Sequence, residues 1–126
     1  MAEVSDFDVA TPARFLRAEN LSTRFHGGGR NERRTAILQF RALGGYRADV
    51  PGMSIRVSLN GSSLGQFSVP RWQSHAYIIP HVVMADFVSD RIRPSGSNEL
   101  VFDPVYADDS DYCWIGPAMV HFRQNS

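Results

Sequence analysis

The sequence contains no lysine and a single cysteine among its 126 residues. All thirteen basic residues are arginine, and thirteen acidic residues balance them to a formal net charge of zero. A neutral chain has no field that attracts phosphate groups, so we expect no binding to nucleic acid or to a membrane. The missing lysine has two explanations: the codon bias of a GC-rich genome, or selection of planar, bidentate arginine at an interface or sugar site.

Neither a metal nor another cofactor is expected. Cys113 has no second cysteine to pair with and lies in an apolar run, which predicts a small buried side chain rather than a catalytic thiol. The four histidines lack the spacings of a zinc site. The acidic segment 103–111 does not match a calcium loop, so we expect a solvated turn there, with calcium binding as the alternative.

Long apolar runs are also missing. No stretch approaches ~18 apolar residues, and residues 1–15 lack the basic and apolar regions of a secretory signal. We therefore expect a chain without a signal peptide that is cytoplasmic, or exported or assembled without a classical signal. The length predicts one domain over residues 1–126, with an acidic N-terminal arm or an edge segment over residues 1–12.

The most informative segment that is present is 54–69, which reads SIRVSLNGSSLGQFSV. Its first half continues an apolar alternation with period 2, typical of a half-buried strand, at Met53, Ile55, Val57 and Leu59. Asn60 and Gly61 accept positive φ angles, so the chain can reverse there before the alternation resumes. The segment predicts a β-hairpin.

Turn residues recur about every ten positions along the rest of the chain, and between them we expect short strands at 14–25, 74–79 (closed by Pro80), 99–102, 112–115 and 119–123. Segment 35–43 fits a strand or a helix, and we favour the strand because the elements after it are β. Segment 81–88 has helical spacing. The pattern is typical of an all-β, antiparallel two-sheet β-sandwich with at most one short helix.

Four motifs follow one another within residues 35–123. They are the VSLNGSSLG hairpin at 57–65, the segment from Trp72 to the YIIP at 77–80, the NELVF strand at 98–102 and the closing VHF strand at 120–122. In this order they resemble the galactose-binding-like jelly roll, a fold of carbohydrate-binding modules and of accessory domains in glycoside hydrolases. The resemblance implies a jelly-roll sandwich and a binding rather than a catalytic domain.

Aromatic residues in loops are the candidate binding surface. A sugar needs a flat apolar platform for its C–H face and planar polar groups for its hydroxyls. Tyr46 lies in a glycine-rich loop, and Trp72 lies in a loop after a proline. Together with neighbouring polar residues they give the predicted ligand-binding set of Tyr46, Arg47, Arg71, Trp72 and His75.

Two further aromatic residues near the C-terminus are interpreted differently. Tyr112, beside Asp111, is an additional candidate for the binding surface. Trp114 lies between Cys113 and Ile115, and we expect it in the core. The sequence shows no carboxylates that pair across a cleft as in a glycosidase, and no phosphate loop, so we expect no enzyme activity.

Two functional hypotheses remain. The first is a non-catalytic binding module that recognises a carbohydrate or similar surface ligand through loop aromatics and arginines. The second is a structural or assembly protein, such as a subunit or decoration protein of a phage particle or related protein shell. The partner is accordingly a glycan or a protein surface, and the second hypothesis predicts a homo-oligomer or larger assembly without sugar affinity.

Overall fold

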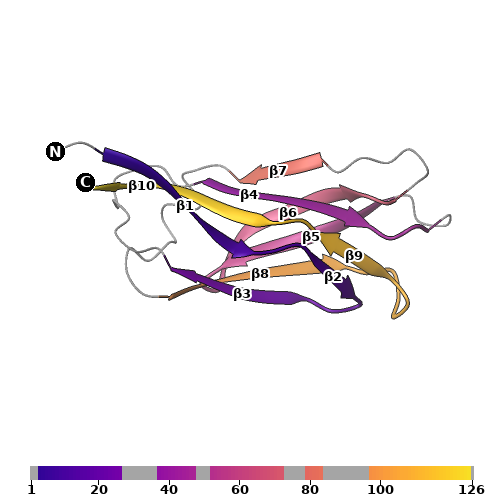
Figure 1. Cartoon of the computed structure of the whole chain (residues 1–126). Helices are drawn as coiled ribbons and strands as arrows, with labels where there is room; N and C mark the ends of the chain where they lie inside the picture. The colour runs from indigo at the N-terminus through magenta and orange to yellow at the C-terminus, as the bar shows by residue number, and fades with distance from the viewer. Residues whose placement is uncertain (1–2, 27–36, 48–51, 73–78, 84–96, 126) are drawn as a thin grey trace.

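The computed structural model describes residues 3–26, 37–47, 52–72, 79–83 and 97–125. These residues form two antiparallel β-sheets that pack face to face, and no helix occurs among them (Figure 1). None of this part of the chain could therefore cross a bilayer as a helix. The strands are β1 (Glu3–Thr11), β2 (Arg14–Arg17), β3 (Leu21–His26), β4 (Ile37–Gly44), β5 (Gly52–Leu59), β6 (Ser62–Pro70), β7 (Ile79–Val83), β8 (Ser97–Val105), β9 (Tyr112–Ile115) and β10 (Ala118–Asn125).

The first sheet has the order β1-β10-β4-β9-β2, and β7 pairs with β4. Strands β9 and β10 follow one another along one edge of β4, separated only by Gly116 and Pro117, while β7 occupies the other edge. Likewise, β1 pairs with β10 and β2 pairs with β9, and only Pro12 and Ala13 separate β1 from β2. The sheet therefore continues past the interruptions, and β2 and β9 lie at the end opposite the chain termini (Figure 1).

The second sheet has the order β3-β8-β5-β6 and contains the predicted hairpin. Asn60 and Gly61 have φ angles of 51° and 84°, which confirms the tight reversal between β5 and β6. Residues 61–65 also spell the G-x-S-x-G pattern of a nucleophile elbow, but they lie in this hairpin rather than between a strand and a helix. Ser63 instead accepts a hydrogen bond from the Gly65 amide through its hydroxyl oxygen at 3.2 Å.

The core lies between the two sheets and comes from alternate residues of the central strands. In β5 the four predicted inward residues, Met53 to Leu59 in steps of two, are all buried. Phe40 of β4 is fully buried and packs edge-to-face on Phe102 of β8 at a ring-centroid distance of 5.1 Å. This contact joins the centres of the two sheets.

Two expectations need correction, the N-terminal arm and the strand end at Pro80. Residues 3–11 are the edge strand β1, paired with β10 along its length, which confirms the edge segment and not the arm, so the sandwich extends beyond the 35–123 match. Pro80 does not close a strand but lies inside β7. A proline is tolerated there because β4 is the only partner of β7 among the described residues, and sheets accommodate proline on such edge strands.

Segment 35–43 is confirmed as a strand, since residues 37–44 form β4 with Leu38, Phe40 and Ala42 facing the core. The first part of the predicted 81–88 helix, residues 81–83, belongs to β7. The remainder of that segment and most of the predicted strand at 74–79 lie outside the described residues.

Candidate functional site

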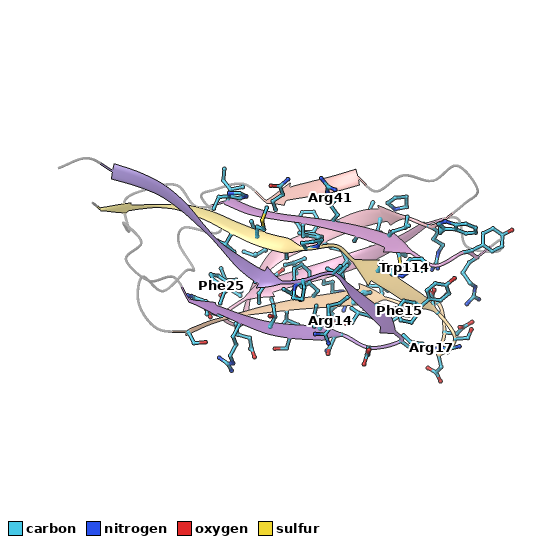
Figure 2. The ribbon with its side chains drawn as sticks, in the orientation of Figure 1. Arg14, Phe15, Arg17, Phe25, Arg41 and Trp114 are labelled. Carbon is cyan, nitrogen blue, oxygen red and sulfur yellow. The ribbon has the colours of Figure 1, made fainter. Side chains whose placement is uncertain are left out.

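Aromatic side chains form a row across the outer face of the first sheet. Phe15 of β2 pairs with Trp114 of β9, which pairs in turn with Leu43 of β4. Residues directly opposite each other in an antiparallel ladder lie on the same face. Because Cys113 and Ile115 on either side of Trp114 are buried, alternation turns Trp114 outward (Figure 2). The expectation that Trp114 belongs to the core is therefore wrong.

The rings of this row are in mutual contact. The Phe15 ring lies 5.7 Å from the Trp114 ring and 5.4 Å from the Tyr112 ring, measured between centroids. Tyr112 and Trp114 meet edge-to-face at 5.1 Å. Phe15 remains 52% exposed, which is a large apolar area for a side chain to leave in water.

Trp72 and Tyr46 add a second aromatic pair at the same end of the sheet. Their rings meet edge-to-face at 6.2 Å, and both are about half exposed, at 47% and 54%. The Trp72 amide donates a hydrogen bond of 2.7 Å to the Gly44 carbonyl, which fixes the backbone of Trp72 to the end of β4. The structure thus brings together the two aromatic residues that the sequence predicted for the site.

A cavity of about 570 Å³ opens between these groups, and we call it the aromatic cavity. Its floor and walls come from β2, β4, β9 and the residues that follow β6 and β9. Its lining residues are Ala13, Arg14, Phe15, Arg41, Leu43, Trp72, Trp114, Ile115, Gly116 and Pro117. Apart from the two arginines, the lining side chains are apolar or aromatic.

Arg71 does not line the aromatic cavity but belongs to the lining of a second cavity. The side chain is 2% exposed, and its guanidinium forms two hydrogen bonds of 2.8 Å with the two carboxylate oxygens of Asp111. It also donates to the Gly45 and Gly52 carbonyls at 3.2 and 3.1 Å. Because these bonds occupy a buried guanidinium, the prediction that Arg71 contacts ligand is corrected to a supporting role.

Asp111 completes this buried ion pair. Its carboxylate also accepts hydrogen bonds from the amides of Ala107 and Tyr112, both at 2.9 Å. The bonds from Arg71 are the main cause that lowers the pKa of Asp111 to about 2, against the opposing effect of burial. Asp111 is fully buried, so the expected solvated turn does not include it.

The ion pair determines where three aromatic residues emerge. Trp72 follows Arg71, Tyr112 follows Asp111, and Tyr46 follows Gly45, whose carbonyl Arg71 binds. Gly45 must be glycine for packing, because a Cβ there would lie 2.6 Å from the Tyr112 ring. The Arg71–Asp111 pair therefore orders the backbone from which the exposed rings project.

The remaining predicted site residues have different positions. Arg47 forms a bidentate pair with Asp108, at 3.0 and 2.9 Å, on the loop beside Tyr46. The bonds from Arg47 and Ser110 lower the pKa of Asp108 well below its usual range. His75 lies outside the described residues. Sequence reasoning missed Phe15, although strict alternation around Leu16 would have turned it outward.

A second and larger cavity, of about 780 Å³, lies at the ends of β5, β6 and β8. Tyr106 contributes the one aromatic ring among its lining residues, and the Tyr106 hydroxyl is engaged by donating to the Glu19 carbonyl at 2.6 Å. This cavity offers no aromatic platform like that formed by Trp72, Trp114 and Phe15. The aromatic cavity is therefore the better candidate, despite its smaller volume.

No family model matches the chain, and no curated protein matches it in sequence. Solved structures do share its fold. A family 36 carbohydrate-binding module of a multidomain xylanase, from the hindgut metagenome of Trinervitermes trinervoides, superposes with a TM-score of 0.52 at 10% identity. That match covers 85% of this chain and 74% of the module. The chain therefore has the jelly-roll β-sandwich fold of this module.

Two further structures show the same fold in different settings. A family 35 carbohydrate-binding module from Clostridium thermocellum matches with a TM-score of 0.51 at 9% identity, over 93% of this chain and 97% of the module. A β-porphyranase of glycoside hydrolase family 86 from Bacteroides plebeius matches with a TM-score of 0.57 at 16% identity. The match covers 98% of this chain but only 21% of the porphyranase. At these identities the likeness concerns the fold alone.

Proposed function

We propose that this protein is a non-catalytic carbohydrate-binding module whose ligand occupies the aromatic cavity. One observation supports this most directly: Trp72, Trp114 and Phe15 line one open cavity on the outer face of the first sheet. Pyranose rings expose apolar C–H faces that stack on flat aromatic surfaces. A volume of about 570 Å³ lies within the range of small-molecule sites.

Tyr46 supports the proposal from the rim of the cavity. Its edge-to-face contact restrains the Trp72 ring, while the Trp72 backbone is hydrogen-bonded to Gly44. A platform that is ordered before the ligand arrives loses little conformational entropy on binding. This arrangement suits recognition by stacking.

The chemistry of the lining favours binding over hydrolysis. A glycosidase of the usual kind places two carboxyl groups on either side of the bond that it cleaves. No acidic side chain is among the residues that line the aromatic cavity in the described part of the chain. The fold shared with two carbohydrate-binding modules is consistent with this reading.

The test is affinity gel electrophoresis against a panel of soluble plant, algal and microbial polysaccharides. We expect at least one polysaccharide to retard the wild-type chain. Trp72→Ala should abolish the retardation, since an aromatic anchor at the centre of a site contributes about 2 kcal/mol or more. The variant should keep its circular dichroism spectrum because the Trp72 side chain is half exposed.

Val105→Ala is the matched control. Val105 is also an exposed large apolar residue, but it lines the larger cavity. Binding that survives in Trp72→Ala and disappears in Val105→Ala would move the site to the larger cavity. If no polysaccharide retards the wild-type chain, the proposed function is wrong.

A further inference from the structure

We propose that the aromatic cavity selects glycans that carry an anionic group, either a uronate carboxylate or a sulfate ester, and that Arg14 and Arg41 bind this group. The inference rests on the proposed carbohydrate binding and adds the charge of the ligand. Arg41 comes from β4 and Arg14 from the start of β2, so they lie on the two strands that flank β9 (Figure 2). Arg14 is opposite the core-facing Ile115, so its exposed side chain reaches the cavity from the edge strand β2 rather than from the outer face of the sheet. Both side chains are exposed.

Four exposed arginines of the described residues have no acidic partner, Arg14, Arg17, Arg41 and Arg56, and of these only Arg14 and Arg41 line the aromatic cavity. Arg24 pairs with Glu99, Arg47 with Asp108, and Arg71 with Asp111, and the distances are 3.6, 2.9 and 2.8 Å. Within the described ranges, no ion pair or side-chain hydrogen bond engages Arg14 or Arg41. Their guanidinium groups are therefore available to a ligand.

The charged side chains that line the cavity are all positive. Its lining contains two arginines and no acidic residue among those described, although the chain as a whole has zero net charge. A cation beside the apolar walls formed by Trp72, Trp114 and Phe15 interacts more strongly with an anion than it would in open water. The cavity thus combines a stacking surface for the sugar ring with a positive charge for a substituent.

Arginine also has the geometry for this group. Its planar guanidinium donates two parallel hydrogen bonds to a carboxylate or to a tetrahedral oxyanion. The backbone of Arg41 is fixed beside Gly116, because the Gly116 amide donates a hydrogen bond of 2.7 Å to the Arg41 carbonyl. A Cβ at position 116 would lie 3.1 Å from the Arg41 Cβ, so glycine gives the Arg41 stem its space beside the cavity.

The experiment uses an array in which each uronate-bearing or sulfated oligosaccharide stands beside its neutral parent, the methyl ester or the desulfated form. The variants are Arg14→Gln and Arg41→Gln, and the control is Arg17→Gln, an exposed arginine of β2 that does not line the cavity. We expect the wild-type chain to bind an acidic member at least tenfold more tightly than its parent. Each cavity variant should lose roughly tenfold of that affinity.

The control and the neutral parents separate the possible results. Arg17→Gln should bind like the wild type, and all three variants should keep the wild-type melting temperature. The inference is wrong if the wild-type chain binds the neutral parents as tightly as the acidic glycans and only Trp72→Ala loses this binding. That result would leave the proposed function intact. It is also wrong if polyphosphate, which contains no sugar, binds as tightly as an acidic glycan and binds Trp72→Ala unchanged. If the array binds nothing at all, the proposed function fails together with the inference.

The two anionic groups are distinguished within the same array. Uronates and their methyl esters report on the carboxylate, and sulfated glycans and their desulfated forms report on the sulfate ester. Preference for either acidic member, lost in Arg14→Gln and Arg41→Gln, supports the inference and identifies the group.

Discussion

Removing the charge of Asp111 should destabilise this protein strongly at neutral pH and much less in acid. The Arg71–Asp111 pair is buried, with side-chain exposures of 2% and 0%. Asp111→Asn leaves the Arg71 guanidinium buried without a counter-charge. The loss of one partner from a buried pair costs about 3–5 kcal/mol.

The pH dependence follows from the pKa of Asp111. Its ordinary value of 3.8 falls to about 2 in the folded protein. A group whose pKa is lowered by folding stabilises the folded state above its ordinary pKa. This contribution is lost as the pH falls from about 4 to about 2. A shift of nearly two units corresponds to roughly 2.5 kcal/mol.

Urea unfolding of the wild-type and Asp111→Asn chains at pH 7 and pH 2 tests both numbers. The difference in unfolding free energy should shrink by roughly 2 kcal/mol at pH 2, because Asp111 is only half protonated at its folded pKa. Asp108→Asn is the control, because Asp108 forms its pair with Arg47 at the exposed surface and should matter far less. A difference between wild type and Asp111→Asn below about 1 kcal/mol at pH 7, or one that does not change with pH, refutes the reasoning.

Three further predictions concern the core, the turn and the thiol. Phe40→Ala should lower the unfolding free energy by about 3–5 kcal/mol in urea titrations, because Phe40 is fully buried against Phe102; a loss below 1 kcal/mol contradicts this. Gly61→Ala should lower the unfolding free energy by about 1–2 kcal/mol in the same titrations, because Gly61 has a φ angle of +84°. Nothing lies within 4 Å of the new Cβ, so this cost comes from the backbone conformation alone. An unchanged unfolding free energy would argue against the turn. Burial raises the pKa of Cys113 to about 12, so the native thiol should resist Ellman's reagent at pH 8. It should react only after the chain unfolds. Rapid reaction of the native chain would place the thiol at the surface.

Features that depend on neighbouring residues were predictable from the sequence. The β5–β6 hairpin needs only an apolar alternation and two residues that accept positive φ, and both are local. The same local rule also applies to Trp114, whose neighbours Cys113 and Ile115 are buried. That prediction failed because an apolar run was interpreted as wholly buried, whereas alternation sends the middle residue to the other face.

Features that depend on distant pairing were not predictable. Strand β1 gains its place only by pairing with β10 at the other end of the chain. The contact between Phe15 and Trp114 joins residues almost a hundred positions apart, and the Arg71–Asp111 pair spans forty. A single sequence contains no local trace of such pairs, so the aromatic cavity became visible only in the folded chain.

The position of the Arg71–Asp111 pair suggests that stability and binding can be separated. An apolar replacement of both residues, Arg71→Met with Asp111→Leu, removes the buried charges together and should recover most of the stability lost in Asp111→Asn. It cannot replace the hydrogen bonds that Arg71 donates to the Gly45 and Gly52 carbonyls, nor those that Asp111 accepts from Ala107 and Tyr112. Those bonds fix the backbone next to Tyr46, Trp72 and Tyr112. We therefore expect the double variant to melt above Asp111→Asn but below the wild type, because these backbone groups lose their partners. It should bind glycan at least tenfold more weakly by calorimetry, because a small displacement of a stacking platform reduces its contact with the sugar. Wild-type affinity in a stable double variant would show that the ion pair supports the fold without ordering the aromatic cavity.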